Sequence, residues 1–590
     1  MTLALADYEH RPARIANVVA LVVGITMLMA LLWVGFGIFA PTGWWNDRPF
    51  TADPAWIVSY WMGTFIDIIS SGKNVIFGID EARAASGATQ AILGGFDLDR
   101  PILTRLAAAC AGAWTSAMIV HSFILLQTPV RDTREHVEGL RLLQGKPAQR
   151  SASVSLARAA QNQGFGLRLA PKLMLSKLRE LRGILIVGAT GSGKTRLILY
   201  LLDSILGAMR SNPQRRIRLL VHDTTGEIAD GIPLDRSEFA ILHGHKPGGY
   251  CWAMGRDIVS IEDAESAGSA FAPETRESMW GDGSGTLIAG CLVLNQYRHG
   301  LNWGAEEFYD TLLTDPIVLR QALETLYPPA AQLIMIEPDT GGLSRTTVSF
   351  FLSFRAAVLR QMRPLAQNWV DGKPFSFIDW LEDRPGQPSV VIVQRSGKHS
   401  DLSAGWIGAI VDAIAAHASD EQFPNSQRRR IFLCLDELAA LKRLRSLPDL
   451  LDVGRNKGVG VIAALQEVEQ LRSIYGADMA TSLLKRFRTK IVCQQNQDAA
   501  TDELTRTLIG MRTVRIEQTS ETTTKGKDGV STSTARTKQE KEVPVVRGER
   551  LAYGLGVFDN KVRALIVGLG DIVQIDWPLT VWSKRHRTRK

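Results

Sequence analysis

Residues 183–202 constrain the fold more than any other part of the sequence. They read GILIVGATGSGKTRLILYLL, in which a short apolar run precedes the pattern G-x-x-x-x-G-K-[ST] and an apolar, helix-like stretch follows it. This order is that of a phosphate-binding loop between a buried strand and a helix. Glycines let successive backbone N–H groups turn toward phosphates, and the positive end of the helix faces the same anion. An α/β domain that binds a nucleotide is therefore predicted.

The predicted loop comprises eight consecutive residues: Gly188, Ala189, Thr190, Gly191, Ser192, Gly193, Lys194 and Thr195. The ammonium group of Lys194 is expected to contact the β- and γ-phosphates, and the hydroxyl of Thr195 is expected to ligate Mg²⁺. ATP and Mg²⁺ are thus the predicted cofactors.

A second apolar run, residues 431–435, ends in two acidic residues, Asp436 and Glu437. Asp436 is expected to hold Mg²⁺ through water, and Glu437 is expected to polarise the water that attacks the phosphate. The alternative is that Asp436 only caps a helix that begins at Leu438. The phosphate-binding loop elsewhere in the chain favours the catalytic interpretation.

Further strand-like runs also end in polar residues; they lie at residues 217–222, 389–393, 459–464 and 490–493. Strands that alternate with helical stretches indicate a mostly parallel sheet whose ligands lie at the carboxyl ends of the strands. Gln466 follows the third of these runs. Its amide is expected to sense the γ-phosphate, and a buried structural glutamine is the alternative.

The distance in sequence between the two nucleotide motifs indicates an insertion. Lys194 and Asp436 are 242 positions apart (436 minus 194), whereas βα units of about 30 residues would place the acidic strand within about 100 residues. Residues 264–370 carry apolar positions at helical spacing. We therefore predict an all-α domain at 264–370, inserted into a nucleotide-binding domain formed by residues 165–263 and 371–580.

Two apolar segments near the amino terminus are long enough to cross a membrane. Residues 15–39 contain only Asn17 and Thr26 as polar side chains, and residues 106–126 are uncharged; about 20 apolar residues suffice to span the hydrocarbon core. A cleavable signal peptide is the alternative for the first segment, but its apolar run is longer than such peptides carry. Basic residues outside the pair place both ends in the cytoplasm. Residues 1–150 are thus predicted to form a membrane domain with an outer-side loop.

The remaining features bound the function only weakly. Residues 518–542 are polar and almost free of apolar side chains, so a flexible loop is predicted. Residues 581–590 form a basic tail, which is either solvated or in contact with DNA phosphates or anionic lipid.

The formal charge of +8 is weak support for a polyanionic partner. The five cysteines lie far apart without a C-x-x-C pair, which argues against a zinc site or a disulfide framework.

Taken together, these motifs resemble the TraD/TrwB-type coupling proteins of conjugative type IV secretion. The resemblance lies in GATGSGKT, in FSFIDWLEDRPGQPSVVIV (375–393), in LCLDELAALKRLRSLPDLLDVGRNKGVGVIAALQEVEQLRSIYG (434–476) and in the two amino-terminal spans. It implies an α/β fold, with a RecA-like P-loop ATPase domain that carries the inserted all-α domain and follows a two-helix transmembrane region. Six such domains would form a ring with ATP between subunits.

The resemblance also implies site residues and partners. Arg182 and Arg455 look like arginines that reach the neighbouring subunit's γ-phosphate, where such a finger stabilises transition-state charge; a solvated arginine is the alternative for Arg182. The all-α domain would meet DNA or the relaxase. The family's place is the bacterial inner membrane, with both termini and the ATPase domain cytoplasmic, and its partners include secretion-channel components.

The function that the resemblance implies is ATP-driven translocation of relaxase-bound single-stranded DNA into a type IV secretion channel, with double-stranded DNA as an alternative substrate. Two other functions stay open: a FtsK/HerA-type double-stranded DNA motor, and a docking receptor in which ATP stabilises the ring without pumping. The sequence departs from the family where Asp223-Thr224-Thr225-Gly226 replaces the usual Asp-Pro-x-Gly.

Overall fold

The computed structural model describes residues 135–161, 163–212, 216–272, 278–526 and 529–586, together with the isolated positions 25 and 114. Apart from those two positions, the predicted membrane spans at 15–39 and 106–126 lie outside the described residues. Within the described part, one helix is long and apolar enough to cross a membrane, α17 (Ser400–Ser419). It is 67% buried inside the protein and packs in the core.

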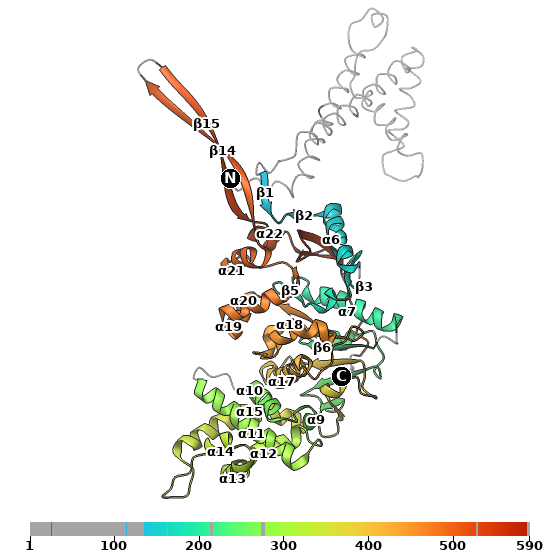
Figure 1. The fold of residues 1–590 in the computed structure, drawn as a ribbon, viewed down its shortest axis with the longest axis vertical. Helices are drawn as coiled ribbons and strands as arrows, with labels where there is room; N and C mark the ends of the chain where they lie inside the picture. The colour runs from blue at the N-terminus through green and yellow to red at the C-terminus, as the bar shows by residue number, and fades with distance from the viewer. Residues whose placement is uncertain are drawn as a thin grey trace, which may run out of the picture. The chain divides into compact units, whose positions relative to one another are not determined.

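The chain divides into two compact units. One comprises Met1–Glu135 and Ile516–Gln539, and the other comprises His136–Arg515 and Glu540–Lys590. The larger unit is built around a mixed sheet, which Figure 1 shows with helices on both faces. Its predicted nucleotide motifs therefore belong to one compact body.

Seven neighbouring strands of this sheet are parallel and form its centre. In spatial order they are β13 (Thr489–Val492), β5 (Ile184–Val187), β12 (Val459–Leu465), β11 (Arg430–Leu435), β6 (Ile217–Asp223), β10 (Val390–Gln394) and β7 (Phe239–His243). The six strands predicted from apolar runs are confirmed to within one or two residues at their ends. Such continuous apolar runs suit parallel strands, which are buried on both faces.

Short strands extend the sheet at both edges. Beside β7 lie β8 (Tyr250–Trp252) and β9 (Lys373–Phe375), and beside β13 lie β17 (Lys561–Val567), β18 (Ile572–Pro578), β16 (Gly556–Phe558) and β2 (Leu142–Leu143). The strands β17 and β18 are antiparallel, so the carboxyl-terminal segment covers the β13 edge. A separate pair is formed by β3 (Phe165–Ala170) and β4 (Leu173–Ser176).

Two apolar cores cover the two faces of the sheet, and alternate residues of each strand enter different cores. In β5, Leu185 and Val187 join the core that includes α17, whereas Ile184 and Ile186 join the core that includes α7 (Lys194–Ser211). The first core also receives α18 (Leu447–Lys457), and the second receives α6 (Gly145–Ala160). Burial on both faces fixes the strand register, because a shift by one residue would exchange the two cores.

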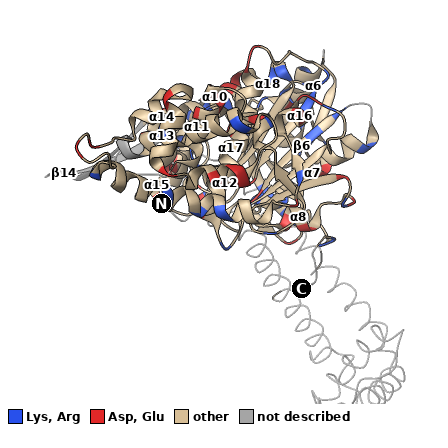
Figure 2. Ribbon diagram, turned by 90° about the horizontal axis from the view of Figure 1, so that it is seen from below, with Lys and Arg blue, Asp and Glu red and all other residues tan. Residues whose placement is uncertain are grey.

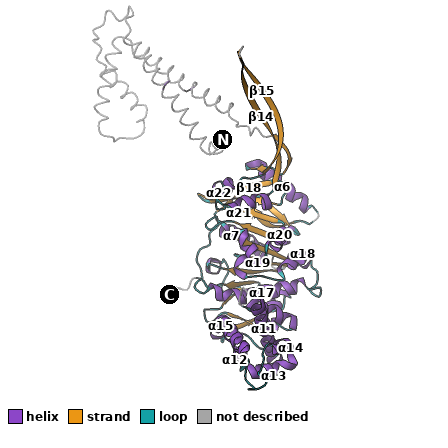
Figure 3. Cartoon of the chain, turned by 90° about the vertical axis from the view of Figure 1, so that its left-hand side faces the viewer, coloured by secondary structure: helices purple, strands orange, loops and turns teal. Residues whose placement is uncertain are grey.

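Helices fill the described part of the chain between β8 and β9, and no strand of the main sheet comes from it. They are α9 (Met254–Asp257), α10 (Ile261–Phe271), α11 (Ser278–His299), α12 (Ala305–Leu313), α13 (Pro316–Leu326), α14 (Pro328–Gln332) and α15 (Arg345–Asn368). Figure 3 shows α11 to α15 grouped together and separate from the strands. Buried aromatic rings of Phe271, Phe308 and Phe354 pack among these helices.

The prediction of a loop at residues 518–542 is wrong. Its described residues, 518–526 and 529–542, belong to two long strands, β14 (Met511–Gly526) and β15 (Gly529–Pro544), which form a separate sheet with β1 (Glu135–Gly139). The prediction considered only the lack of apolar surface. Threonine is β-branched and favours extended backbone, and cross-strand hydrogen bonds satisfy the backbone without an apolar core.

Part of the predicted basic tail at residues 581–590 packs on the nucleotide-binding domain, while its described basic residues Lys584 and Arg585 are exposed. The indole N–H of Trp582 donates to the carboxylate of Asp203 (2.8 Å), and the backbone N–H groups of Arg585 and His586 donate to the carbonyl of Asp230 (2.8 and 3.0 Å). The described part of the tail is thus attached to the nucleotide-binding domain, because these backbone groups find partners there. Residues 587–590 lie outside the described residues.

A buried ion pair ties the start of β11 to the segment before β5. The carboxylate of Glu180 accepts a hydrogen bond from the guanidinium of Arg430 (2.8 Å), and the two side chains are only 2% and 3% exposed. The second oxygen of Glu180 accepts from the backbone N–H of Leu167 (2.7 Å).

Replacing Glu180 by alanine is expected to lower the free energy of unfolding by about 3–5 kcal/mol, because the Arg430 guanidinium would stay buried without its carboxylate. The control is Glu324→Ala, which breaks the exposed Arg320–Glu324 pair (side chains 32% and 55% exposed) and should cost less than about 1 kcal/mol. Urea unfolding midpoints measure both. Equal midpoints for the two variants would contradict the prediction.

Candidate nucleotide site

The predicted nucleotide residues follow three adjacent strands. Parallel strands present their carboxyl ends at one edge of the sheet, where α/β proteins bind ligands. The strand β12 lies between β5, which precedes the glycine-rich loop, and β11, which precedes the acidic pair. Gln466, the residue after β12, is therefore placed between Lys194 and Glu437 in space, although it follows both in sequence.

The glycine-rich loop is held by both neighbouring strands. The N–H of Gly188 donates to the carbonyl of Leu465 at the end of β12 (3.1 Å), and the N–H of Ala189 donates to the carbonyl of Gln494 after β13 (2.8 Å). Gly191 and Gly193 have positive φ angles of 79° and 96°, which glycine adopts without steric cost. The loop thus wraps over the start of α7 and exposes backbone N–H groups at a helix amino terminus.

Lys194 lies at the centre of this edge. Its ammonium group donates to the carbonyl oxygens of Gly188 (2.5 Å) and Ala189 (3.1 Å). Burial lowers its pKa, and the charges of Glu437 and Asp436 oppose that shift. The group faces both the loop and the acidic pair, which is the position from which it can meet bound phosphates.

The two acidic residues have different surroundings. Asp436 is buried, and its carboxylate accepts a hydrogen bond from the hydroxyl of Thr224 (2.5 Å), the residue after β6. Burial raises the pKa of Asp436, while the Thr224 hydrogen bond and the Lys194 charge oppose the rise. A carboxylate held this way keeps a fixed direction and can ligate a hard cation.

Glu437 is half-buried, whereas Asp436 is buried. Burial raises its pKa to about 7, and the charge of Lys194 and hydrogen bonds from Gln466 act in the opposite direction. The hydroxyl of Thr190 in the loop donates to the side-chain oxygen of Gln466 (3.2 Å). Gln466 therefore contacts both the phosphate-binding loop and Glu437, and a carboxyl group with a pKa near neutrality suits proton transfer.

The helix-capping alternative for Asp436 does not describe the structure. The short 3₁₀ helix at Leu438–Leu441 has Glu437 as its N-cap residue, and no side chain caps it. The carboxylate of Asp436 instead points to Thr224. The capping interpretation of Asp436 is therefore wrong.

Two residues beside the acidic pair were not predicted as site residues, although the sequence showed both as a departure from the family pattern. Thr224 holds the Asp436 carboxylate, and Asp223 accepts hydrogen bonds from the N–H groups of Gly226 and Ala229 (both 2.8 Å). Burial raises the pKa of Asp223 to about 6 against these hydrogen bonds. The sequence feature that could have identified both residues is their position directly after a buried strand, because ligands bind at the carboxyl ends of the strands in such a sheet.

Arg182 and Arg455 do not join this edge. Arg182 precedes β5 and Arg455 lies near the end of α18, just before β12, so both occupy the amino-terminal edge of the sheet. They lie close to one another, because Gly183, next to Arg182, packs against Leu451 of α18. Burial lowers the pKa of Arg182, and the charge of Arg455 lowers it further. Within one chain, neither arginine can reach the phosphate-binding loop.

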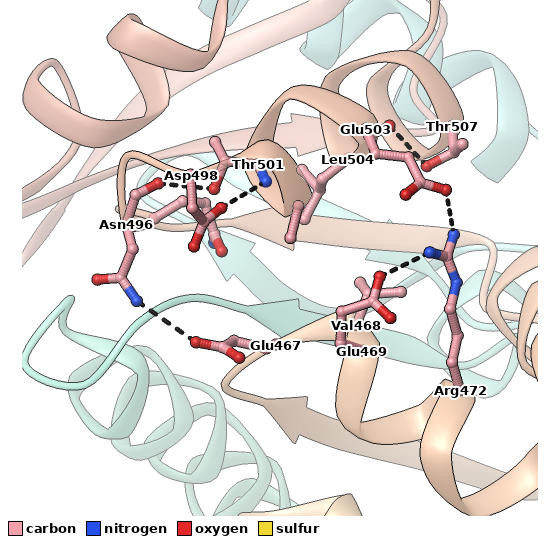
Figure 4. Close-up of a pocket in the computed structure, with 12 residues that line it drawn as sticks. Glu467, Val468, Glu469, Arg472, Asn496, Asp498, Thr501, Glu503, Leu504 and Thr507 are labelled. Atoms are coloured by element: carbon pink, nitrogen blue, oxygen red, sulfur yellow. Dashed lines mark hydrogen bonds and ion pairs between the residues drawn. The ribbon is translucent and has the colours of Figure 1, made fainter.

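A small pocket adjoins the site beyond Gln466. Figure 4 shows it between the residues after β12 and those after β13, with Arg472 reaching two carboxylates. Arg472 pairs with Glu469 (2.6 Å) and Glu503 (2.5 Å), which joins α19 (Val468–Tyr475) to α21 (Ala499–Leu504). The cavity holds about 20 Å³, room for about one water molecule. It is a structural junction and too small for a nucleotide.

Several known proteins are similar to this chain in sequence. TraD, a coupling protein from Escherichia coli (strain K12), is 26% identical over 320 residues, which are 53% of this chain and 41% of TraD. The conjugal transfer protein TraG from Rhizobium radiobacter is 30% identical over 177 residues, 30% of this chain and 26% of TraG. The chain thus spans less than half the length of these relatives.

Solved structures share the fold. The conjugative coupling protein TrwBdeltaN70 superposes with a TM-score of 0.58 at 19% identity, over 76% of this chain and 95% of that one. TrwB in complex with ADP and Mg²⁺ gives a TM-score of 0.57 at 20% identity, over 78% and 97%. The predicted α/β class is confirmed by this likeness.

A family model described as the type IV secretion-system coupling protein DNA-binding domain matches residues 168–552. The matched range contains the glycine-rich loop, the acidic pair, Gln466 and the helices between β8 and β9. Since it covers more than half of the sequence, the chain belongs to the family of type IV secretion-system coupling proteins.

Proposed function

We propose that this chain is an ATP-driven motor that passes relaxase-bound single-stranded DNA to a type IV secretion channel during conjugation. The observation that carries the proposal is the meeting of Lys194, Asp436, Glu437 and Gln466 at one edge of the sheet, in a chain of the coupling-protein family. ATP and Mg²⁺ are supported as cofactors by TrwB, which has been solved with ADP and Mg²⁺ and with the ATP analogue ADPNP.

The residues fit such a nucleotide. Backbone N–H groups of the loop and the ammonium of Lys194 would bind the phosphates, and Thr195 and Asp436 would hold Mg²⁺. Within the described residues no group of three or more His, Cys, Asp or Glu could hold a metal by itself. Mg²⁺ usually takes one or two protein ligands and completes its shell with phosphates and water.

Hydrolysis would proceed by attack of water on the γ-phosphorus. Glu437 accepts the proton of that water as the new P–O bond forms and the bond to the β-phosphate oxygen breaks, which yields ADP and phosphate. Gln466 orients the water and Glu437. Its contact with Thr190 links the catalytic acid to the loop that binds the phosphates.

We also propose a ring of six chains, in which Arg182 and Arg455 of one subunit complete the nucleotide site of the next. Their position at the edge opposite the loop supports this assignment, because it directs them away from their own site. Arginine supplied in trans makes hydrolysis depend on assembly. The helices predicted at 15–39 and 106–126 would anchor the ring in the bacterial inner membrane, with both termini and the motor cytoplasmic. The predicted bound of the membrane domain at residue 150 is wrong, because residues 142–150 supply β2 and the start of α6 of the nucleotide-binding domain.

The helical domain at 264–370 is proposed to contact protein cargo, such as the relaxase, in preference to DNA. It contains seven arginines, no lysine and eleven acidic residues, a formal charge of −4, whereas DNA-binding surfaces are basic. Figure 2 shows acidic residues on α12, whose sequence carries three acids and no base. Its described residues also expose large apolar side chains, including Tyr297, Leu301 and Leu352.

A docking receptor that binds ATP without pumping is the second candidate. The same phosphate-binding residues would serve it, but it has no need for Glu437 beside Gln466. The family match argues against the FtsK/HerA-type motor.

Replacing Lys194 by alanine should reduce ATP hydrolysis and conjugative transfer at least about 100-fold, because the variant loses the cation that faces the phosphates. Phosphate release by the purified chain and transfer frequency in complemented cells measure the two effects. Lys177→Ala is the control, since Lys177 is exposed and lies away from the loop. Normal transfer by the Lys194 variant would sink the motor proposal, and lost hydrolysis with normal transfer would favour the docking receptor.

The pH dependence of hydrolysis should report Glu437. Its pKa of about 7 leaves the carboxyl protonated below neutrality, where it cannot accept a proton. We therefore expect kcat/KM to rise about tenfold per pH unit below pH 7 and to level off above it. Glu437→Gln should bind ATP but hydrolyse it at a rate independent of pH. Rapid turnover by that variant would remove Glu437 from its role.

Charge reversal on α12 should separate cargo contact from hydrolysis. Glu306 and Asp310 are exposed four residues apart on one helical face. The double variant Glu306→Lys/Asp310→Lys is expected to keep its ATPase rate and to lower transfer about tenfold or more, through loss of one hot-spot contact. A matched reversal outside the domain, Asp235→Lys/Glu421→Lys, should retain transfer. Tighter DNA binding with higher transfer by the α12 variant would contradict the assignment to protein cargo.

A further inference from the structure

Two arginines precede neighbouring strands at the amino-terminal edge of the sheet. Arg182 lies two residues before β5, and Arg488 lies one residue before β13. The N–H of Arg488 donates to the carbonyl of Arg182 (3.1 Å), and the N–H of Thr489 donates to the carbonyl of Gly183 (3.3 Å). These hydrogen bonds hold the two arginines side by side, although they are 306 positions apart (488 minus 182).

Arg455 joins them from α18. Gly183 packs so closely on this helix that a Cβ atom there would lie 3.1 Å from Leu451 Cδ2. Leu451 and Arg455 are four residues apart and share one face of the helix. The charges of Arg455 and Arg488 both lower the pKa of Arg182, after the larger effect of burial.

No acidic partner of these three cations is found in the part of the chain that the structure describes. Among the described residues, no carboxylate forms an ion pair with Arg182, Arg455 or Arg488, and Arg455 has only a long hydrogen bond to Asn456 (3.4 Å). By contrast, Arg486 pairs with Asp452 (2.9 Å). Three positive charges held close together repel one another. An anion that accepts hydrogen bonds from several guanidinium groups would offset this repulsion.

A fourth arginine holds the arrangement in place. The guanidinium of Arg179 donates to Thr489 Oγ1 (3.3 Å), to the carbonyl of Arg488 (3.3 Å) and to the carbonyl of Gly568. Its donors are thus directed into the fold. Arg179 is a positioning residue that fixes the backbone from which Arg488 extends.

The anion that these arginines suit cannot be the chain's own nucleotide. The four residues of β5 separate Arg182 from the glycine-rich loop, a length of roughly 13 Å before the loop itself begins. A second subunit is the available source of a concentrated negative charge, because its nucleotide carries three phosphates. We propose that Arg488 acts beside Arg182 and Arg455 as a third arginine that contacts the nucleotide phosphates held by the adjacent subunit. This inference rests on the proposed ring motor.

The test begins with the purified full-length chain. Arg488→Ala should bind a fluorescent ATP analogue with unchanged Kd, because its own loop is intact, while kcat falls at least about tenfold. Arg488→Lys should recover only part of the rate, since lysine lacks the planar fork. The neighbouring Arg486→Ala is the control and should retain kcat within about twofold, because an exposed pair contributes little.

Coexpression distinguishes a role in the adjacent subunit from a structural one. Arg488→Ala and Lys194→Ala chains should each be impaired alone, whereas mixed rings should hydrolyse faster than either variant, at interfaces that join an intact loop to an intact Arg488. Failure of the mixture to regain activity would overturn the inference. A wild-type hydrolysis rate for Arg488→Ala would also overturn the inference. If that variant kept the rate but lost single-stranded DNA binding, the ligand of Arg488 would be DNA. Absence of hydrolysis in the wild-type chain would overturn the motor proposal instead.

Discussion

Parallel pairing of β12 between β5 and β11 is the interaction on which the site depends. Backbone hydrogen bonds place Leu465 opposite Val187 and Cys434 opposite Ile462, so three strands end at nearly the same height. The residues that follow these strands therefore lie close together in space, although they are far apart in sequence. Because both faces of these strands are buried, their register cannot shift without exchanging the two apolar cores. The position of Lys194, Gln466 and Glu437 is therefore a consequence of core packing.

The same strands give the molecule two unlike edges. Their carboxyl ends carry the glycine-rich loop and the acidic pair, and their amino ends carry Arg182, Arg455 and Arg488. In an isolated chain, the lysine ammonium binds the loop's own carbonyl oxygens, and no carboxylate of the described residues forms an ion pair with the arginines. In a ring, the carboxyl-terminal edge of one subunit would lie against the amino-terminal edge of the next. The phosphates of one bound nucleotide would then pair with the lysine of their own subunit and with the arginines of its neighbour. Hydrolysis would therefore depend on assembly.

Local signals explain which parts of the structure could be predicted from the sequence. Strands such as β5 and β11 are short apolar runs with a polar end, and the glycine-rich loop has a fixed spacing, so a few adjacent residues were enough. The β14–β15 hairpin was missed because its strands lack an apolar face and depend on cross-strand backbone pairing. The Thr224–Asp436 hydrogen bond and the position of Arg488 beside Arg182 were missed for a different reason. They join segments hundreds of residues apart, and only the strand order brings them together.

The helical insertion is tied to the sheet in a way that bears on how a motor could move cargo. It leaves from β8 and returns through β9, and these two strands pair in parallel, with Trp252 opposite Phe375. A buried carboxylate, Asp257, clamps both ends: it accepts from the indole N–H of Trp252 (2.8 Å), the hydroxyl of Ser376 and the N–H of Phe377 (2.9 Å).

Burial raises the pKa of Asp257 to about 6 against these hydrogen bonds, so at neutral pH the clamp is ionised and each bond to it is charge-assisted. An insertion joined by two loose linkers would absorb motion of the sheet by bending. An insertion joined through paired strands and a shared buried carboxylate must instead move together with the sheet as one rigid body. Any rotation of the nucleotide-binding domain in the ring would then be transmitted to the acidic surface of α12, where we place the cargo.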